Sequence, residues 1–315
     1  MEFFEDLRPC DIAFSTITDG IYKFFPDIEE KEIKFFYHGT YNVFEVKDHY
    51  IFRIPDKTLR NQKGVQLLLN EVKMLHHIQK YVSVAIPDPI YISIDPDCPI
   101  MGYEKIPGIP LHKLFNKISE EDKMQIAANI GEFLGELHSK KLFKDAKNNK
   151  IVDNSFSCEK YKQNLEEYFK IIQSLLFSLL NHEQKQWIIR LFTNFLDNKV
   201  NFKFNYSIIH GDFDSSNILI DPNILNVIGV VDFEESRVYD PAADLLFYNE
   251  GDIFFQKVLK SYNENIDANF KERMKFLYGQ SCLGYLKYGI ENNLPDLVNW
   301  GFKLLKMRMN QFPII

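Results

Sequence analysis

The sequence lacks the usual features of a secreted protein, of a protein with a structural zinc site, or of a membrane protein. Its four cysteines are scattered, and no two have the CxxC spacing of a zinc or redox site. No basic segment followed by an apolar run stands at the start, and the most apolar stretch, residues 171–180, is too short to span a bilayer. We therefore expect free thiols in a soluble cytoplasmic protein without a membrane partner.

Positive charge is also scarce. The 37 Lys and Arg residues are outnumbered by 44 Asp and Glu residues, which gives a formal net charge of −7. A surface of this sign does not attract nucleic acid, so we expect no nucleic-acid partner. It suits a cationic small-molecule substrate, and we expect the chain to act on it as a monomer.

Apolar residues, in contrast, are abundant. They make up 45% of 315 residues, which excludes a largely disordered chain. This length exceeds what one hydrophobic core usually covers, so two lobes are expected. Residues 107–110, Pro-Gly-Ile-Pro, mark a break in the pattern. We place the lobes at residues 1–106 and 107–315.

The first lobe has the pattern of a small α+β unit. Residues 34–46 are rich in Phe, Tyr and Val and are interrupted by His38-Gly39-Thr40, and residues 50–54 form a second strand stopped by Pro55. Residues 64–81 have helical periodicity. Two more strands are expected at residues 90–94 and 100–106.

The second lobe is expected to be mainly helical. Ser119 has the position of an N-cap for a helix that ends near His138. Residues 140–150 are rich in lysine and are interpreted as a solvated connection. Further helices are expected at residues 159–180 and 183–197, with three more between 252 and 309. One β-like piece, residues 207–232, interrupts them.

That β-like piece carries the chemistry. An apolar run leads to His210-Gly211-Asp212, Asn217 follows five residues after the aspartate, and a second apolar run ends at Asp232. A hairpin over residues 218–231 would bring Asn217 and Asp232 together, and their oxygens are ligands that Mg²⁺ prefers. Phosphoryl transfer requires such metal ligands and a carboxylate that orients the acceptor hydroxyl, here Asp212. His210 is interpreted as a structural hydrogen-bonding residue.

These motifs resemble those of the aminoglycoside phosphotransferase and choline kinase superfamily, which has a protein-kinase-like fold. The HGDxxxxN motif at residues 210–217 is similar to its catalytic loop, and Val231-Asp232-Phe233-Glu234 to its metal-binding segment. Residues 134–139 and Asp240-Pro241-Ala242-Ala243-Asp244 also match, while residues 288–291 are similar to the 2''-phosphotransferase branch. The resemblance implies a two-lobed α+β fold, ATP or GTP as co-substrate, Mg²⁺ and an O-phosphorylated product.

The resemblance also implies where the nucleotide binds. The family has a lysine on the third strand that pairs with a helix glutamate; here the matching basic residue is Arg53, and its expected partner is Glu71. Lys47 and Lys57 are alternatives. The single-glycine loop near residue 39 would present Thr40 and Asn42 to the phosphates. The inter-lobe hinge would use Glu104 and Ile106.

The acceptor is predicted from charge. Residues 210–252 contain ten acids and one base, so a cationic aminoglycoside would be attracted there, and resistance would follow. Asp214, Glu234 and Glu235 are the predicted contacts. From residue 253 onward, however, nine bases outnumber five acids. This leaves open a same-fold kinase for a macrolide, choline, a sugar or an amino alcohol. Arg53 in place of lysine leaves open a pseudokinase.

Overall fold

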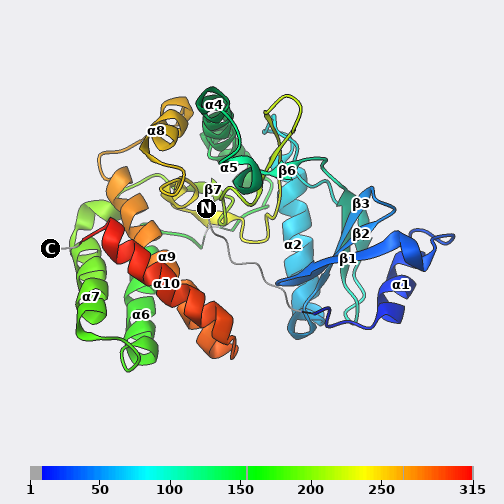
Figure 1. The fold of residues 1–315 in the computed structure, drawn as a ribbon, viewed down its shortest axis with the longest axis horizontal. Coiled ribbons are helices and arrows are strands. Elements are labelled where there is room, and N and C mark those ends of the chain that lie inside the picture. The colour runs from blue at the N-terminus through cyan, green and yellow to red at the C-terminus, as the bar shows by residue number, and fades with distance from the viewer. Residues whose placement is uncertain (1–8, 154, 265, 314–315) are drawn as a thin grey trace.

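The computed structural model describes residues 9–153, 155–264 and 266–313. A small antiparallel sheet with two helices comes first along the chain, and a larger, mainly helical part follows (Figure 1). The expected α+β architecture is therefore confirmed. The division at residue 106 stays a prediction.

The sheet of the first part has five strands, each antiparallel to its neighbours, in the order β1-β2-β3-β5-β4. The expected hairpins are present, with the interruption at residues 39–40 between β1 and β2. The strand bounds are β1 (Ile33–His38), β2 (Tyr41–Val46), β3 (Tyr50–Pro55), β4 (Tyr91–Ser93) and β5 (Ile100–Glu104).

The two faces of this sheet belong to different cores. Helix α1 (Phe14–Tyr22), which the pattern did not predict, packs Ile17 and Ile21 against Phe44 and Phe52 on one face. Helix α2 (Gln62–Ile78) packs on the other face and stands between the sheet and the helical part (Figure 1). Because side chains alternate along a strand, residues such as Arg53 project to the α2 face.

The helical part contains α3 (Leu111–Leu114) and seven longer helices. Helix α4 begins after Ser119, whose hydroxyl accepts a hydrogen bond from the N–H of Asp122, so the predicted cap is confirmed. Helix α4 lies beside α8, and α9 beside α10 (Figure 1). The longer helices are α4 (Glu120–Leu137), α5 (Lys140–Asn148), α6 (Cys158–Leu176), α7 (His182–Asp197), α8 (Asp252–Ser261), α9 (Phe270–Glu291) and α10 (Pro295–Gln311).

Two short sheets interrupt these helices and position the site. One has the order β6-β8-β9, with β6 (Ile109–Pro110), β8 (Ile218–Ile220) and β9 (Val227–Val230). The other pairs β7 (Ser207–Ile209) with β10 (Arg237–Tyr239). Short 3₁₀ turns complete the fold at residues 30–32, 57–59, 199–202 and 241–244.

The interpretation of residues 140–150 as a solvated connection was wrong. Residues 140–148 form α5, and Leu142 and Ala146 are fully buried because they lie one turn apart on the face that packs against the protein. The lysines of this helix occupy its outer face, which hid the short apolar stripe. Ile109 and Pro110 likewise belong to a strand, β6, rather than to a simple break.

All four cysteines are free thiols. Among the helices of the described residues, none has both the length and the apolar character that crossing a bilayer requires.

Candidate active site

The loop after β7 presents the predicted catalytic aspartate. Gly211 has a φ of +95°, and a Cβ atom there would lie 2.4 Å from the carbonyl oxygen of Glu235, so the position requires glycine. This sharp turn leaves the side chain of Asp212 exposed at the end of the β7 segment. Asp212 is therefore available to a substrate.

The hairpin of β8 and β9 brings the two predicted metal ligands together, as expected. The N–H of Val231 donates to the carbonyl oxygen of Asn217 at 3.0 Å, which sets Asn217 beside the residue before Asp232. The amide nitrogen of Asn217 donates to the carbonyl oxygen of Asp212 at 2.9 Å. The amide oxygen of Asn217 thus points elsewhere, and it and the Asp232 carboxylate are the hard oxygen donors that suit Mg²⁺.

Asp232 has a strained backbone. Its φ of +70° lies in the left-handed region, which is unfavourable for a residue with a side chain. Such strain persists where the surrounding structure holds it, and it is concentrated at functional sites. In this conformation the Asp232 carboxylate accepts a hydrogen bond from Arg53 at 3.1 Å, which joins the two parts of the molecule.

Arg53 is the centre of the cluster. It lies on β3 and is 4% exposed. Its guanidinium nitrogens lie 2.5 Å from Glu71 on α2 and 2.9 Å from Glu234, and its plane stacks on the ring of Tyr41 at 4.2 Å. The predicted ion pair between Arg53 and Glu71 is present, and Asp232 completes the set of three acidic partners.

The cluster carries more negative than positive charge. Burial opposes the charge of Arg53, but Glu71, Asp232 and Glu234 raise its pKa well above the ordinary value. Burial also raises the pKa of Glu71, against the pull of Arg53, and the pKa of Glu234 to about 7. Although Asp212 is exposed by its accessible surface, the protein packed around the carboxyl group still raises its pKa to about 8 by desolvation, reinforced by Asp214 and Asp232. Such a surplus of carboxylates favours binding of a cation.

A second, fully buried layer holds the catalytic loop. Asp244 accepts hydrogen bonds from the N–H groups of His210 at 2.6 Å and Gly211 at 2.9 Å, and it pairs with His138 at 3.0 Å. The ring of His210 lies 2.9 Å from the carbonyl oxygen of Val231, so the structural role predicted for His210 is confirmed. The DPxxD spacing signalled Asp244, but its contact with the loop was not foreseen.

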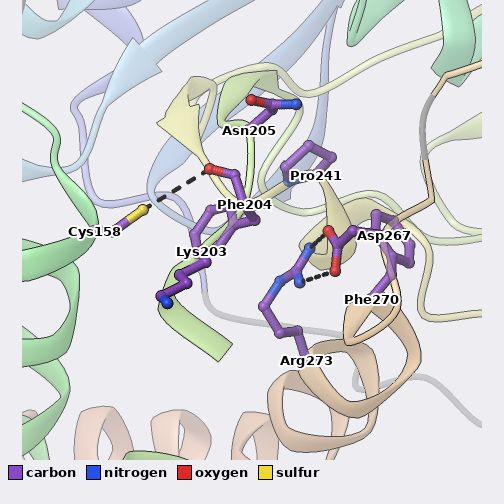
Figure 2. A pocket seen from close by; sticks show the side chains of 8 residues that line it. All are labelled: Cys158, Lys203, Phe204, Asn205, Pro241, Asp267, Phe270 and Arg273. Atoms are coloured by element: carbon purple, nitrogen blue, oxygen red, sulfur yellow. Dashed lines mark hydrogen bonds and ion pairs between the residues drawn. The ribbon is translucent and has the colours of Figure 1, made fainter. Parts of the chain in front are cut away.

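Asp240, from the matching DPxxD segment, has a structural role. It is fully buried, caps the turn at Ala242 and pairs with Arg273 at 2.7 Å. Arg273 also pairs with Asp267, at the wall of a pocket between α6 and α9 (Figure 2). None of the predicted catalytic or nucleotide-binding residues lines that pocket.

The two predicted residues of the glycine loop lie in different environments, and the contact of Thr40 with phosphates stays a prediction. Thr40 hydrogen-bonds to Glu234 and so lies at the cluster. Asn42, in contrast, is fully buried, and its amide nitrogen donates to Asp11 at 2.7 Å. This geometry does not support the predicted contact of Asn42 with phosphates. The cause is strand alternation, because Asn42 projects from β2 to the side opposite Tyr41.

The alternatives to Arg53 lie elsewhere. Lys47 is in the turn between β2 and β3 and stacks on Phe25, and Lys57 lies in a 3₁₀ turn after β3. At the predicted hinge, Glu104 ends β5 and is exposed, while Ile106 packs against Gly229 of β9. The hinge role of these two residues stays a prediction.

The predicted acceptor contacts occupy three different environments. Asp214 accepts hydrogen bonds from the backbone N–H and hydroxyl of Ser216, and so shapes the turn after Asp212. Glu235 is exposed and pairs with Arg237 at 2.8 Å. Glu234 is bound to Arg53, which makes it part of the cluster rather than a free contact for a substrate.

Tyr41 was missed by sequence reasoning. The register pairs Val43 with Arg53, so Tyr41, two residues from Val43, projects from the same face as Arg53 and its ring can reach the guanidinium. The alternation in β2 was a signal for this placement, but it needed the register, which the sequence does not provide.

Comparison with known proteins agrees with this geometry. The model of the phosphotransferase enzyme family matches residues 32–270. No curated protein matches the chain. Among solved structures, the GDP complex of wild-type aminoglycoside 2'-phosphotransferase-IIIa is 22% identical with a TM-score of 0.81, covering 96% of this chain and 100% of that one.

Two other solved structures show that the fold is shared more widely. ADP-bound aminoglycoside phosphotransferase APH(2'')-Ib is 24% identical with a TM-score of 0.66, covering 92% of this chain and 96% of that one. Macrolide 2'-phosphotransferase MphH from Brachybacterium faecium is 16% identical with a TM-score of 0.70, covering 92% and 98%. With its catalytic loop, its arginine cluster and a family match over residues 32–270, the chain belongs to the phosphotransferase enzyme family.

Proposed function

We propose that this phosphotransferase moves the γ-phosphate of ATP or GTP to a hydroxyl group of an aminoglycoside, and that resistance to the antibiotic follows. The observation that carries the proposal is the joining of Asp212, Asn217 and Asp232 with the Arg53–Glu71 pair in one cluster. Structures of the same fold contain GDP, ADP, kanamycin and gentamicin.

In this proposal each residue has a distinct task. Arg53, held by Glu71, offers a permanent positive charge and a planar fork to the nucleotide phosphates. Asp212 orients the acceptor hydroxyl and accepts its proton. Asn217 and Asp232 would hold Mg²⁺, which when bound neutralises charge on the phosphate oxygens.

Charge favours a cationic acceptor. Asp214 and Glu235 flank the catalytic aspartate, and their field would concentrate and orient a molecule with several ammonium groups. The surplus of bases after residue 253 and the likeness to a macrolide phosphotransferase fold support a second candidate, a kinase for a macrolide or another small-molecule hydroxyl.

The test is steady-state nucleotide turnover with Mg²⁺, with ATP and GTP supplied separately. Kanamycin, gentamicin, erythromycin and choline are added one at a time. The proposal predicts stimulation by an aminoglycoside and a fall in kcat of about 10²–10⁴-fold in Asp212→Asn, the range of a lost general base.

The matched control is Asp221→Asn. Asp221 caps a turn in the β8–β9 hairpin through the N–H of Asn223, a task that asparagine also performs, so turnover should be unchanged. Stimulation by erythromycin or choline alone would select the second candidate. Nucleotide binding without turnover of any acceptor would contradict both and support a pseudokinase.

A further inference from the structure

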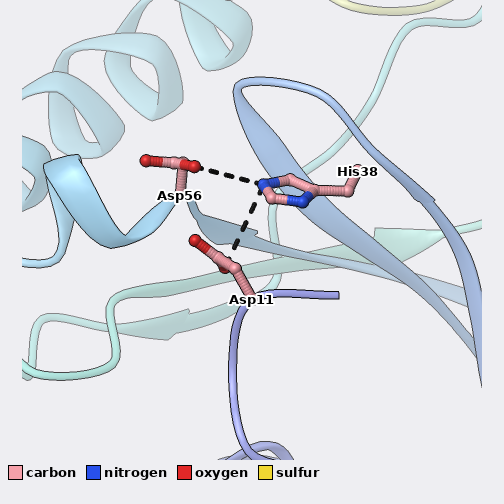
Figure 3. A group of neighbouring side chains, drawn as sticks. All are labelled: Asp11, His38 and Asp56. Carbon is pink, nitrogen blue, oxygen red and sulfur yellow. Dashed lines mark hydrogen bonds and ion pairs between the residues drawn. The ribbon is translucent and has the colours of Figure 1, made fainter. Parts of the chain in front are cut away.

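A second polar cluster lies in the first part of the chain, apart from the Arg53 cluster. His38 ends β1, Asp56 follows β3, and Asp11 belongs to the segment that precedes α1 (Figure 3). Their side chains are 4%, 15% and 14% exposed. One ligand atom from each lies within 4.8 Å of the other two.

The ring of His38 faces hydrogen-bond acceptors on both sides. Its Nδ1 lies 2.7 Å from the carbonyl oxygen of Pro9, which can only accept, so Nδ1 carries a proton. Its Nε2 lies 3.2 Å from a carboxylate oxygen of Asp56 and 4.0 Å from one of Asp11. A neutral ring would direct its lone pair at two carboxylates, so this point requires either a second ring proton or a bound cation.

The spacing also suits a metal ion. The 3.2 Å separation of Nε2 from Asp56 is longer than the roughly 2.7–2.9 Å of a charged imidazolium–carboxylate hydrogen bond. It is close to the roughly 3.3 Å that separates ligand atoms when metal bonds of about 2.0–2.2 Å form a tetrahedral site, while the Asp11 oxygen lies farther from Nε2, at 4.0 Å. Arg60, 3.4 Å from Asp11, offsets one of the two carboxylate charges and leaves the other for the ion.

The surroundings have the pattern of a metal site. Ligating histidines usually donate their second N–H to a carbonyl oxygen, as His38 does to Pro9, and ligating carboxylates are themselves hydrogen-bonded. The N–H of Thr58 donates to Asp56 at 2.8 Å, and the N–H of Lys57 to Asp11 at 2.9 Å. The amide of Asn42 also donates to Asp11, which accounts for its burial.

We propose that Asp11, His38 and Asp56 bind one divalent transition-metal ion, Zn²⁺ or an ion of similar preference, with water completing the coordination. One imidazole and two carboxylates favour such an ion over Mg²⁺ or Ca²⁺, which prefer oxygen ligands alone. The bound ion connects the segment before α1 to the ends of β1 and β3. Thr40 lies between the ligands His38 and Asp56 in the sequence. This inference is independent of the proposed function.

The test uses the full chain, stripped with a chelator and titrated with Zn²⁺ against a chromogenic chelator, with Co²⁺ absorption as a report of tetrahedral geometry. We expect one ion per chain, a rise in melting temperature with Zn²⁺, and at least about tenfold weaker binding in His38→Gln. Asp56→Asn keeps the cap on Thr58 but loses the ligand charge, so it should weaken binding while the chain stays folded.

Two controls separate this site from others. His76 is the matched histidine, since its Nε2 lies near the carbonyl oxygen of Pro89 and pairs with a single carboxylate among the described residues, that of Asp88, so His76→Gln should bind Zn²⁺ normally. Asp232→Asn should also bind normally, because it alters the other cluster. Absence of stoichiometric Zn²⁺ binding, or equal affinity in the wild type and Asp56→Asn, would overturn the proposal.

Discussion

Two buried arginines organise this molecule in different ways. Arg53 and Arg273 are 4% and 1% exposed, and each stacks on an aromatic ring and pairs with several carboxylates. Arg273 has two acidic partners, Asp240 and Asp267, and all three lie in the second part of the chain. Arg53 has three, and two of them, Asp232 and Glu234, come from the segment after β9 in the second part of the chain.

The difference separates a structural cluster from a functional one. Around Arg273 the Asp240 carboxylate is fully buried, so its charged form is stabilised by the guanidinium. The two groups therefore stay paired. Around Arg53, Asp232 and Glu234 are partly exposed, and the carboxylates exceed the cations. The Arg53 cluster has three carboxylates for one cation where the Arg273 cluster has two, and it lies beside Asn217 and Asp212, so its surplus of negative charge is available to a ligand of the candidate active site.

The largest expected change in stability comes from Arg273→Gln. It leaves the buried Asp240 without its cation, and breaking a buried ion pair in this way costs about 3–5 kcal/mol. Denaturant unfolding monitored by tryptophan fluorescence measures the loss. An unfolding free energy within error of the wild type would show that the Arg273 cluster does not hold the second part of the molecule together.

Asp244→Asn should have the next largest effect. An amide oxygen cannot serve both N–H groups of the catalytic loop and His138, so we expect a loss of about 1–3 kcal/mol at neutral pH.

The same variant should change the response to acid. Although burial opposes its charge, His138 and the loop N–H groups lower the pKa of Asp244 below the ordinary value. Its stabilisation is therefore complete above the unfolded carboxyl pKa of about 4 and is lost as pH falls through the lower folded pKa. Unfolding curves across this range should fall less steeply for Asp244→Asn, and parallel curves would contradict the assignment.

Glu71→Gln tests the Arg53 cluster in the same comparison. It removes the partner that fixes Arg53 to α2 but leaves Asp232 and Glu234, so the guanidinium keeps its charge and loses its fixed position. We expect the nucleotide KM to rise about tenfold, the scale of one charged hydrogen bond, with a smaller loss of stability than Arg273→Gln. An unchanged KM would show that the pair does not position Arg53 for nucleotide.

The smallest effects are expected at the acids flanking Asp212. Asp214→Asn and Glu235→Gln should raise the KM for a cationic acceptor about twofold to fivefold, as expected for one partly buried and one exposed charge, and should leave a neutral acceptor unaffected. High salt should reduce the difference. Equal effects on neutral and cationic acceptors would indicate a change in the loop rather than in the field.

Local patterns predicted much of this structure. The hairpin over residues 218–231 and the cap at Ser119 follow from spacing and residue type, and the pair of Arg53 with Glu71 follows from the resemblance to the kinase superfamily. Contacts between distant segments did not follow. Arg53 and Glu234 are separated by 181 positions, and Asp244 reaches the N–H of His210 only through the fold.

Two helices were missed for a physical reason. Helix α5 has a narrow apolar stripe of Leu142 and Ala146 among lysines, and its stability comes from packing rather than from its own pattern. Helix α1 packs on one face of the sheet, and the strand register decides which apolar residues lie on that face. Asn42 shows the same limit, because a motif position does not determine the face from which a side chain projects.

The most direct test of the account compares Arg53→Gln with Arg273→Gln in one experiment. Nucleotide kcat/KM is measured at a temperature where both variants are folded, as judged by circular dichroism. The account predicts a loss of about 10–100-fold for Arg53→Gln, the scale of lost charged hydrogen bonds to phosphate, and a value near the wild type for Arg273→Gln. Full activity in Arg53→Gln, or an equal loss in both variants, would contradict it.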